Sequence, residues 1–174
     1  MGYGSHAARP IRTLPAVTEP LAAAPSRTIP VADGPIAPWA DRAWAIATVA
    51  AASIAFAALA RVQPDPRGHG THEQLGLDAC GWPLAYGIPC PACGCTTAAC
   101  LLVHGRVVAA FATQPFGAAF AAVGLLVGAH AALCLLRGRS FADLALRWPI
   151  WRVTGYGLLL MLAAWGYTCA RWQR

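Results

Sequence analysis

The sequence has little charge and no lysine at all. Charged residues make up 11% of the 174 residues and hydrophobic residues 57%, so the charge is roughly half of what soluble domains carry. A soluble domain of this composition would lack the polar side chains needed to cover its surface. The net charge of +6 comes entirely from arginine. Because the arginines stand singly beside apolar runs, we expect them to flank membrane spans and not to bind nucleic acid.

The sequence also lacks the patterns that usually carry enzyme chemistry. It shows no catalytic triad, no carboxylate pair and no glycine-rich phosphate loop. Its amino-terminal stretch has no apolar core of the kind found in secretory signals. The seven cysteines are an odd number, so at least one thiol stays free or pairs outside the chain. We therefore expect a protein without catalytic activity.

The first 38 residues form a proline-rich segment. From Pro10 to Pro35 a proline recurs every five residues, and Pro38 follows. Neither a helix nor a strand tolerates proline at this frequency. We therefore predict that residues 1–38 are a disordered tail. We interpret this tail as a spacer, with a partner-binding arm as the alternative.

Three apolar stretches in the rest of the chain are long enough to cross a bilayer. Residues 43–60 and 153–170 contain no charged side chain, and residues 116–136 have His130 as their one basic side chain. About 20 apolar residues span the hydrocarbon core as a helix. Tryptophans near the ends of the stretches are typical of membrane interfaces. The sequence therefore predicts an all-α integral membrane domain over residues 39–174, with three transmembrane helices in a lipid bilayer.

The second span carries a pair of glycines and a histidine. Gly124 and Gly128 form a face on which another helix can approach closely, either from this chain or from a membrane-protein partner. His130 is an ionisable group within a span, which makes it a candidate ligand or proton carrier. We expect instead a neutral histidine whose ring bonds to a neighbouring backbone group.

The arginines also indicate how the chain is oriented. The loop between the second and third spans is short and rich in arginine, whereas the longer loop before the second span mixes its arginines with acidic residues. Short loops rich in arginine stay in the cytoplasm. We therefore predict a multi-pass protein of a bacterial inner membrane, with the amino terminus in the cytoplasm and the cysteine-rich loop outside.

Most of the cysteines lie in one loop, within residues 78–111. Cys80, Cys90 and Cys93 are the principal candidates for a site, because Cys90 and Cys93 form a Cys-x-x-Cys pair and intervening glycines let the chain return from Cys80. The stretch from Cys93 until Gly105 is compatible with a helix too short to cross the membrane, so we predict a short re-entrant or interfacial helix. A fourth span near residues 95–111 is the alternative. Weaker candidates for the site follow in the same stretch, namely Cys95, Cys100 and His104.

The cysteine-rich segment also carries a family motif. With Cys80 upstream and Gln114-Pro115 downstream, the run Gly-Ile-Pro-Cys-Pro-Ala-Cys-Gly-Cys-Thr at residues 87–96 resembles the bacterial membrane family known as domain of unknown function 2752. The motif of that family is Cys-Pro-x-Cys-Gly-x-Thr-Arg. Its arginine is Thr97 here, and its usual asparagine before proline is Gln114. No activity is established for the family, so the resemblance implies a membrane architecture around this loop and no mechanism.

Three roles for Cys80, Cys90 and Cys93 remain open. Two of them could form a disulfide that staples the loop. The three could instead hold zinc or another thiophilic metal, although the spacing does not reveal a fourth ligand. A redox dithiol is the third role, because a thiolate at the start of a helix has a lowered pKa.

From these observations the sequence predicts a small polytopic membrane protein of unknown biochemical activity. We expect a non-catalytic membrane component or assembly subunit, a role that needs no cofactor. The alternative is a cysteine-centred membrane protein that binds a metal or performs thiol-redox chemistry.

Overall fold

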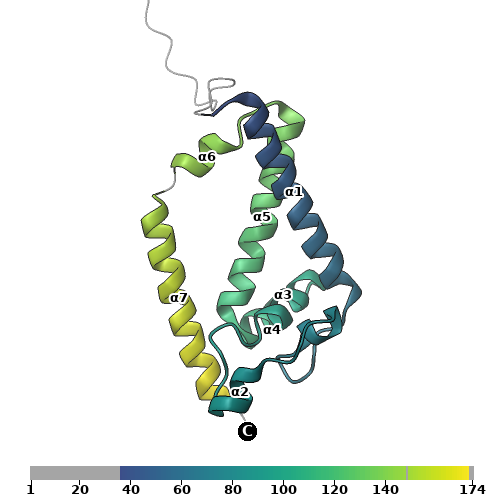
Figure 1. Cartoon of the computed structure of the whole chain (residues 1–174), viewed down its shortest axis with the longest axis vertical. Helices are drawn as coiled ribbons and strands as arrows, with labels where there is room; N and C mark the ends of the chain where they lie inside the picture. Colours follow the sequence, from purple (N-terminus) through teal and green to yellow (C-terminus); the bar gives the residue numbers. More distant parts are fainter. Residues whose placement is uncertain (1–35, 148, 173–174) are drawn as a thin grey trace, which may run out of the picture. The chain divides into compact units, whose positions relative to one another are not determined.

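Three long helices dominate the computed structural model, which describes residues 36–147 and 149–172 (Figure 1). They are α1 (Pro38–Arg61), α5 (Pro115–Arg137) and α7 (Ile150–Arg171). Within the described residues, these three helices are long and apolar enough to cross a membrane, and all regular structure is helical. The predicted fold class, with three spans, is therefore confirmed. Nearly all of the predicted proline-rich tail lies outside the described residues.

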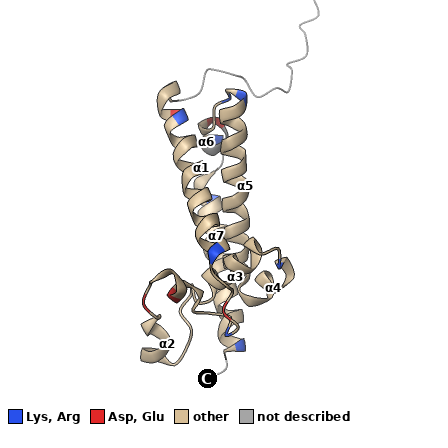
Figure 2. Ribbon diagram, turned by 90° about the vertical axis from the view of Figure 1, so that its right-hand side faces the viewer, with Lys and Arg blue, Asp and Glu red and all other residues tan. Residues whose placement is uncertain are grey.

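Each long helix extends a few residues past the predicted apolar run. The helix α1 begins at Pro38, which the sequence assigned to the tail, and α5 begins at Pro115. Proline suits the first turn of a helix because its missing N–H would have no partner there. All three helices end at an arginine, so charged residues lie at their ends and in the loops, as Figure 2 shows.

The shorter helices gather at the two ends of the long ones. The segment between α1 and α5 forms η1 (Thr71–Leu75), α2 (Gly81–Tyr86), α3 (Cys95–Val103) and α4 (Val107–Thr113). The helix α6 (Ala142–Arg147) lies between α5 and α7, at the opposite end of the bundle (Figure 1). Because α1 runs from one end to the other, the start of α1 and the cysteine-rich loop lie at opposite ends.

The single short helix predicted after the cysteines is in fact two helices. Gly105, with a φ of +74°, breaks the chain between α3 and α4. The N–H groups of His104 and Gly105 close the end of α3 on the carbonyls of Cys100 and Leu102. The fourth span considered near residues 95–111 is wrong, because neither α3, with nine residues, nor α4, with seven, is long enough to cross a bilayer.

Small residues allow the helices to approach closely. A Cβ atom added to Gly128 would lie 2.6 Å from the Cβ of Ala52, so α1 and α5 pack tightly there. Gly124 has no atom within 4 Å of that position, so one glycine of the predicted pair contacts a helix of the same chain and the other remains open. At the start of α5, Gly117 lies directly against the backbone of Cys95 in α3.

A buried carboxylate joins α1 to the loop after α5. The Asp41 side chain is buried, and it accepts hydrogen bonds from Ser140 Oγ at 3.1 Å, Phe141 N at 3.0 Å and Ala142 N at 2.7 Å. Because Ala142 begins α6, Asp41 caps that helix from another part of the chain. In the sequence Asp41 has the appearance of an ordinary charge flanking a span.

His130 pairs with a side chain and not with the backbone group that we expected. Its Nε2 lies 3.5 Å from Cys134 Sγ, one turn further along α5. The His130 ring also faces Phe141, with 6.1 Å between the ring centroids. Cys134 and Phe141 belong to a buried cluster with Ala45 of α1, so this histidine contributes to packing between α1 and α5.

Candidate functional site: a cysteine-lined pocket

The three principal cysteines line one pocket of about 270 Å³. Cys80 precedes α2, and Cys90 and Cys93 belong to the turn that precedes α3. His72, from η1, lines the same pocket. The remaining lining residues are small or uncharged: Gly70, Leu77, Ala92, Gly94, Thr96 and Thr97. The structure therefore brings together the cysteines that the sequence had grouped and adds one histidine.

Local backbone geometry explains how residues ten positions apart meet. The N–H of Cys93 donates to the carbonyl of Cys90 at 2.9 Å, and this turn sets the two side by side. Gly87 ends α2 in the left-handed conformation, with a φ of +68°, and its N–H donates to Pro83 O. Glycine adopts this conformation without a steric cost, so the chain reverses after α2 and returns to the level of Cys80.

The pocket raises the pKa of two of its thiols. Burial is the main cause for Cys90, whose pKa is also affected by the nearby thiols of Cys80 and Cys93. Burial raises the pKa of Cys93 to about 12, and negative charge on Cys90 and Cys80 would raise it further. Both thiols are therefore protonated at neutral pH. This shift is opposite to the lowered pKa that the redox interpretation requires.

The weaker candidates from the sequence lie outside this pocket. Burial raises the pKa of Cys95 to about 11. The Cys100 thiol donates to the carbonyls of Leu59 and Val62, each at 3.5 Å, and so caps the C-terminal end of α1. His104 Nδ1 lies 3.7 Å from Cys100 Sγ and 2.9 Å from Cys100 O. Cys100 therefore joins α3 to α1, and His104 contacts Cys100 at the end of α3. Neither residue lines the cysteine-lined pocket.

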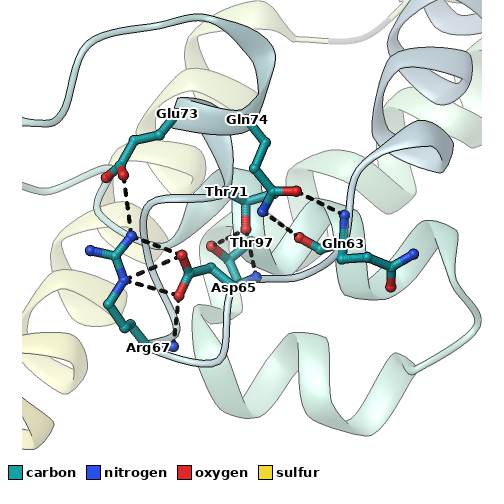
Figure 3. Close-up of polar contacts among 7 residues, drawn as sticks. All are labelled: Gln63, Asp65, Arg67, Thr71, Glu73, Gln74 and Thr97. Carbon is teal, nitrogen blue, oxygen red and sulfur yellow. Dashed lines mark hydrogen bonds and ion pairs between the residues drawn. The ribbon is translucent and has the colours of Figure 1, made fainter.

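A buried pair of threonines holds the pocket wall. Thr97 Oγ1 lies 2.9 Å from Thr71 Oγ1, and Thr71 Oγ1 accepts from Asp65 N at 3.0 Å (Figure 3). Thr71 and Thr97 are almost completely buried. Thr97 stands where the resembled family has arginine. In this chain the short Thr97 side chain contacts Thr71 instead.

Charged and amide groups fix the loop that carries η1 (Figure 3). The Arg67 guanidinium forms ion pairs with Asp65 at 2.8 Å and Glu73 at 3.2 Å, and its hydrogen bonds lower the pKa of Asp65. The Gln74 side chain accepts from Gln63 N at 3.1 Å and donates to Gln63 O at 2.9 Å. These contacts tie η1 to the end of α1 and so position the side of the pocket opposite the cysteine turn.

Gln114 connects the cysteine turn to the second span. Its side chain is fully buried. Oε1 accepts from Gly117 N at 2.8 Å and caps α5, while Nε2 donates to Pro91 O at 3.4 Å. On the other side, Trp165 Nε1 of α7 donates to Pro89 O at 2.8 Å. The segment between Cys80 and Cys93 is thus attached to two membrane helices.

Shortening Gln114 should separate these two contacts. We expect Gln114→Asn to keep the cap on α5 and lose the bond to Pro91, which lowers the free energy of unfolding by about 1 kcal/mol. Gln114→Ala removes both contacts and should cost about 2 kcal/mol. Chemical denaturation in detergent measures both values, with Gln63→Ala, at an exposed side chain, as the control. Equal losses for the two Gln114 variants would contradict a separate role for the Pro91 bond.

The pocket is not arranged as a metal centre in its present geometry. Within residues 36–147 and 149–172, no group of three or more His, Cys, Asp or Glu side chains is placed to hold an ion. In this structure no two of the seven cysteines are bonded to each other. The residue types are nevertheless those that zinc prefers, since three cysteines and one histidine form a common tetrahedral set. Metal binding would require the loop to draw the four side chains closer together.

The fold and the comparisons define the class of this protein. Three membrane-capable helices with a cysteine-rich loop between the first two make it a multi-pass helical membrane protein. Residues 80–128 match the family described as "Protein of unknown function (DUF2752)", which confirms over this segment the family that the motif indicates. The match runs from the first pocket cysteine to the glycine of α5 that contacts α1. No curated protein and no solved structure matches the chain.

Proposed function

We propose that this protein is a non-catalytic membrane component whose cysteine loop is stapled by a disulfide. The observation that carries the proposal is that Cys80, Cys90 and Cys93 share one pocket although ten residues separate the first two. Apart from the cysteines, His72 is the single ionisable side chain among the residues that line this pocket. Since burial raises the pKa of Cys90 and Cys93, the pocket is a poor source of a nucleophilic thiolate. These properties favour a structural role.

Cys80 and Cys90 are the pair that we expect to be joined. A bond between them would close a loop that contains all of α2, and loops of about this length are stabilised by roughly 3 kcal/mol. A bond between Cys90 and Cys93 would close a much shorter loop and stabilise less. Cys93 is also the most buried of the three. Formation of the bond removes two electrons and two protons from the thiols, and a disulfide oxidant accepts them as it is reduced to two thiols.

The arrangement of charge supports an orientation in which this loop lies outside the cell. The end of the bundle that carries α6 has five arginines among the described residues, and the opposite end has four. One arginine at each end forms ion pairs, Arg67 with Asp65 and Glu73 and Arg147 with Asp143, so the α6 end keeps the larger number of unpaired arginines among the described residues. By the positive-inside rule the α6 end faces the cytoplasm of a bacterial inner membrane. The cysteine loop then meets an oxidising compartment, where disulfides persist.

Metal binding is the second candidate function, and the position of His72 favours it. With Cys80, Cys90 and Cys93 it would complete a set of four zinc ligands. A bound cation would also reverse the local pKa shifts, because zinc ligation requires thiolates. This function would make the loop a metal-stabilised unit of the membrane component.

Differential alkylation and metal analysis distinguish these functions. In the protein purified without reductant and then denatured, we expect Cys80 and Cys90 to resist alkylation until reduction, while Cys93 reacts. Cys90→Ser should make the Cys80 thiol react with the alkylating reagent before reduction. Cys93→Ser and the control Cys169→Ser should leave Cys80 and Cys90 protected from alkylation. One zinc per chain, lost in both His72→Ala and Cys93→Ser, would favour the metal site instead. Full alkylation before reduction, without metal, would contradict both.

A further inference from the structure

The segment around α2 exposes apolar side chains that the three spans do not explain. Large apolar residues are exposed on α1, α5 and α7, as expected for helices that face lipid. The helix α2 has six residues and cannot cross a bilayer, yet Leu84 is 88% exposed and Tyr86 is 67% exposed. Exposed apolar patches of this kind usually mark an interaction surface. The exposed large apolar residues of the segment are Leu75, Leu77, Trp82, Leu84, Tyr86 and Ile88.

A hydrogen bond places this segment at the level of the membrane boundary. Trp165 Nε1 donates to Pro89 O at 2.8 Å, and α7 ends six residues later, at Arg171. Six helical residues advance about 9 Å, so Pro89 lies within the last two turns of the third span. Figure 1 shows α2 beside this end of α7, and Figure 2 shows it projecting to the side of the bundle. The bilayer that α7 crosses therefore ends close to α2.

The chemistry of α2 is that of a segment lying in a membrane interface. Trp82 and Tyr86 lie against each other, with 4.9 Å between their ring centroids. Both residue types prefer the headgroup region, where an apolar ring and a polar group can each find a suitable environment. No charged residue occurs between Gly81 and Pro89. A charged partner surface would have nothing to recognise here, whereas a lipid surface requires only apolar area and aromatic rings.

We propose that α2 is an interfacial anchor, which inserts Trp82, Leu84 and Tyr86 into the headgroup and upper acyl region of the bilayer that the three spans cross. Lipid is the expected partner because the exposed surface of α2 continues the membrane-facing surface of α7 and carries no charge. The inference depends on the membrane location of the chain and not on the state of its cysteines. Because Cys80 and Cys90 flank α2, closure of the loop would also hold the anchor beside α7.

Quenching of Trp82 fluorescence tests the anchor in the full chain. The protein is reconstituted into phosphatidylcholine vesicles, with or without bromine on the upper acyl chain, and the emission of Trp82→Phe is subtracted from that of the parent. We expect brominated lipid to remove most of the Trp82 emission and aqueous iodide to remove little. Trp44→Phe, at an exposed position near the start of α1, supplies the matched reference for a tryptophan in contact with lipid.

A second variant relates the quenching to insertion. Leu84→Glu should make Trp82 accessible to iodide and reduce quenching by brominated lipid, since a charge in the headgroup region opposes burial. Its stability in detergent should equal that of the parent, because the Leu84 side chain is exposed. A Trp82 signal quenched by iodide in the parent would overturn the proposal, since α2 would then lie in water. Insensitivity to both quenchers would also overturn it, because Trp82 would then be covered by protein, which in these vesicles is this chain or a second copy of it.

Discussion

Asp41→Ala should lower the free energy of unfolding of the membrane domain by about 3 kcal/mol. The Asp41 carboxylate is buried and accepts three hydrogen bonds from residues 140–142. Alanine would leave the backbone N–H groups of Phe141 and Ala142 without their partner at the start of α6. Hydrogen bonds to a charged acceptor contribute more to stability than bonds between neutral groups. A buried donor that is left without an acceptor also destabilises the fold by its full desolvation penalty. The connection between α1 and the loop after α5 should therefore loosen first.

Unfolding in detergent, followed by circular dichroism, measures this effect. Asp143→Ala is the matched control, because Asp143 lies nearby and forms a partly exposed ion pair with Arg147. Such a pair contributes about 0.5 kcal/mol or less. Asp41→Asn should give an intermediate loss, since an amide has one acceptor oxygen where the carboxylate uses both. If Asp41→Ala and Asp143→Ala had equal effects, the carboxylate would have no special role in joining the helices.

Gly117→Ala should destabilise the domain by a similar amount, about 3 kcal/mol. A Cβ on Gly117 would lie 2.5 Å from the Cα of Cys95 and 3.0 Å from its carbonyl oxygen. Both are backbone atoms, so no side-chain rotation relieves the contact. The methyl group would push α3 away from the start of α5 and move the cysteine turn that precedes α3. The pocket should be disturbed even though Gly117 does not line it.

The same helix offers a close control for this substitution. The methyl group of Gly124→Ala would have no atom within 4 Å, so this variant should lose no stability. Higher helix propensity should raise its free energy of unfolding by up to about 1 kcal/mol. The loss of stability in Gly128→Ala should lie between those of Gly117→Ala and Gly124→Ala. Its new methyl group meets only the Ala52 side chain, and α1 can shift to make room. Denaturation in detergent gives all three values. A Gly117→Ala variant as stable as Gly124→Ala would contradict the close contact between α3 and α5.

The membrane architecture was predictable because it depends on local composition. An apolar run of the right length becomes a span whatever its neighbours are, since the bilayer requires backbone hydrogen bonds to be satisfied within the segment. The positions of α1, α5 and α7 therefore followed from apolar stretches bounded by arginine and tryptophan. The segment that matches the family was also recognisable, because its cysteine, proline and glycine spacing is local.

The candidate site was predictable only in part. The Cys-x-x-Cys spacing identifies Cys90 and Cys93 as neighbours, and glycines after Cys80 permit the chain to return. His72 could not be assigned, because its place beside the cysteines depends on how η1 is held by Gln63 and the Arg67 ion pairs. The end of the short helix before Gly105 agrees with the sequence, whereas the second short helix, α4, was missed because seven apolar residues are too few to show a helical period.

The sequence alone determined that this is a three-span helical membrane protein with a cysteine loop, since hydrophobicity and spacing are properties of short segments. Only the tertiary structure decided which polar groups meet. Asp41 bonds to residues about 100 positions later, and Thr97 bonds to Thr71 from a different element. These contacts form because tight packing of α1 and α3 against α5 excludes water, so buried polar groups must find their hydrogen-bond partners within the protein. Such packing depends on the complementary shapes of distant segments, which no local pattern records.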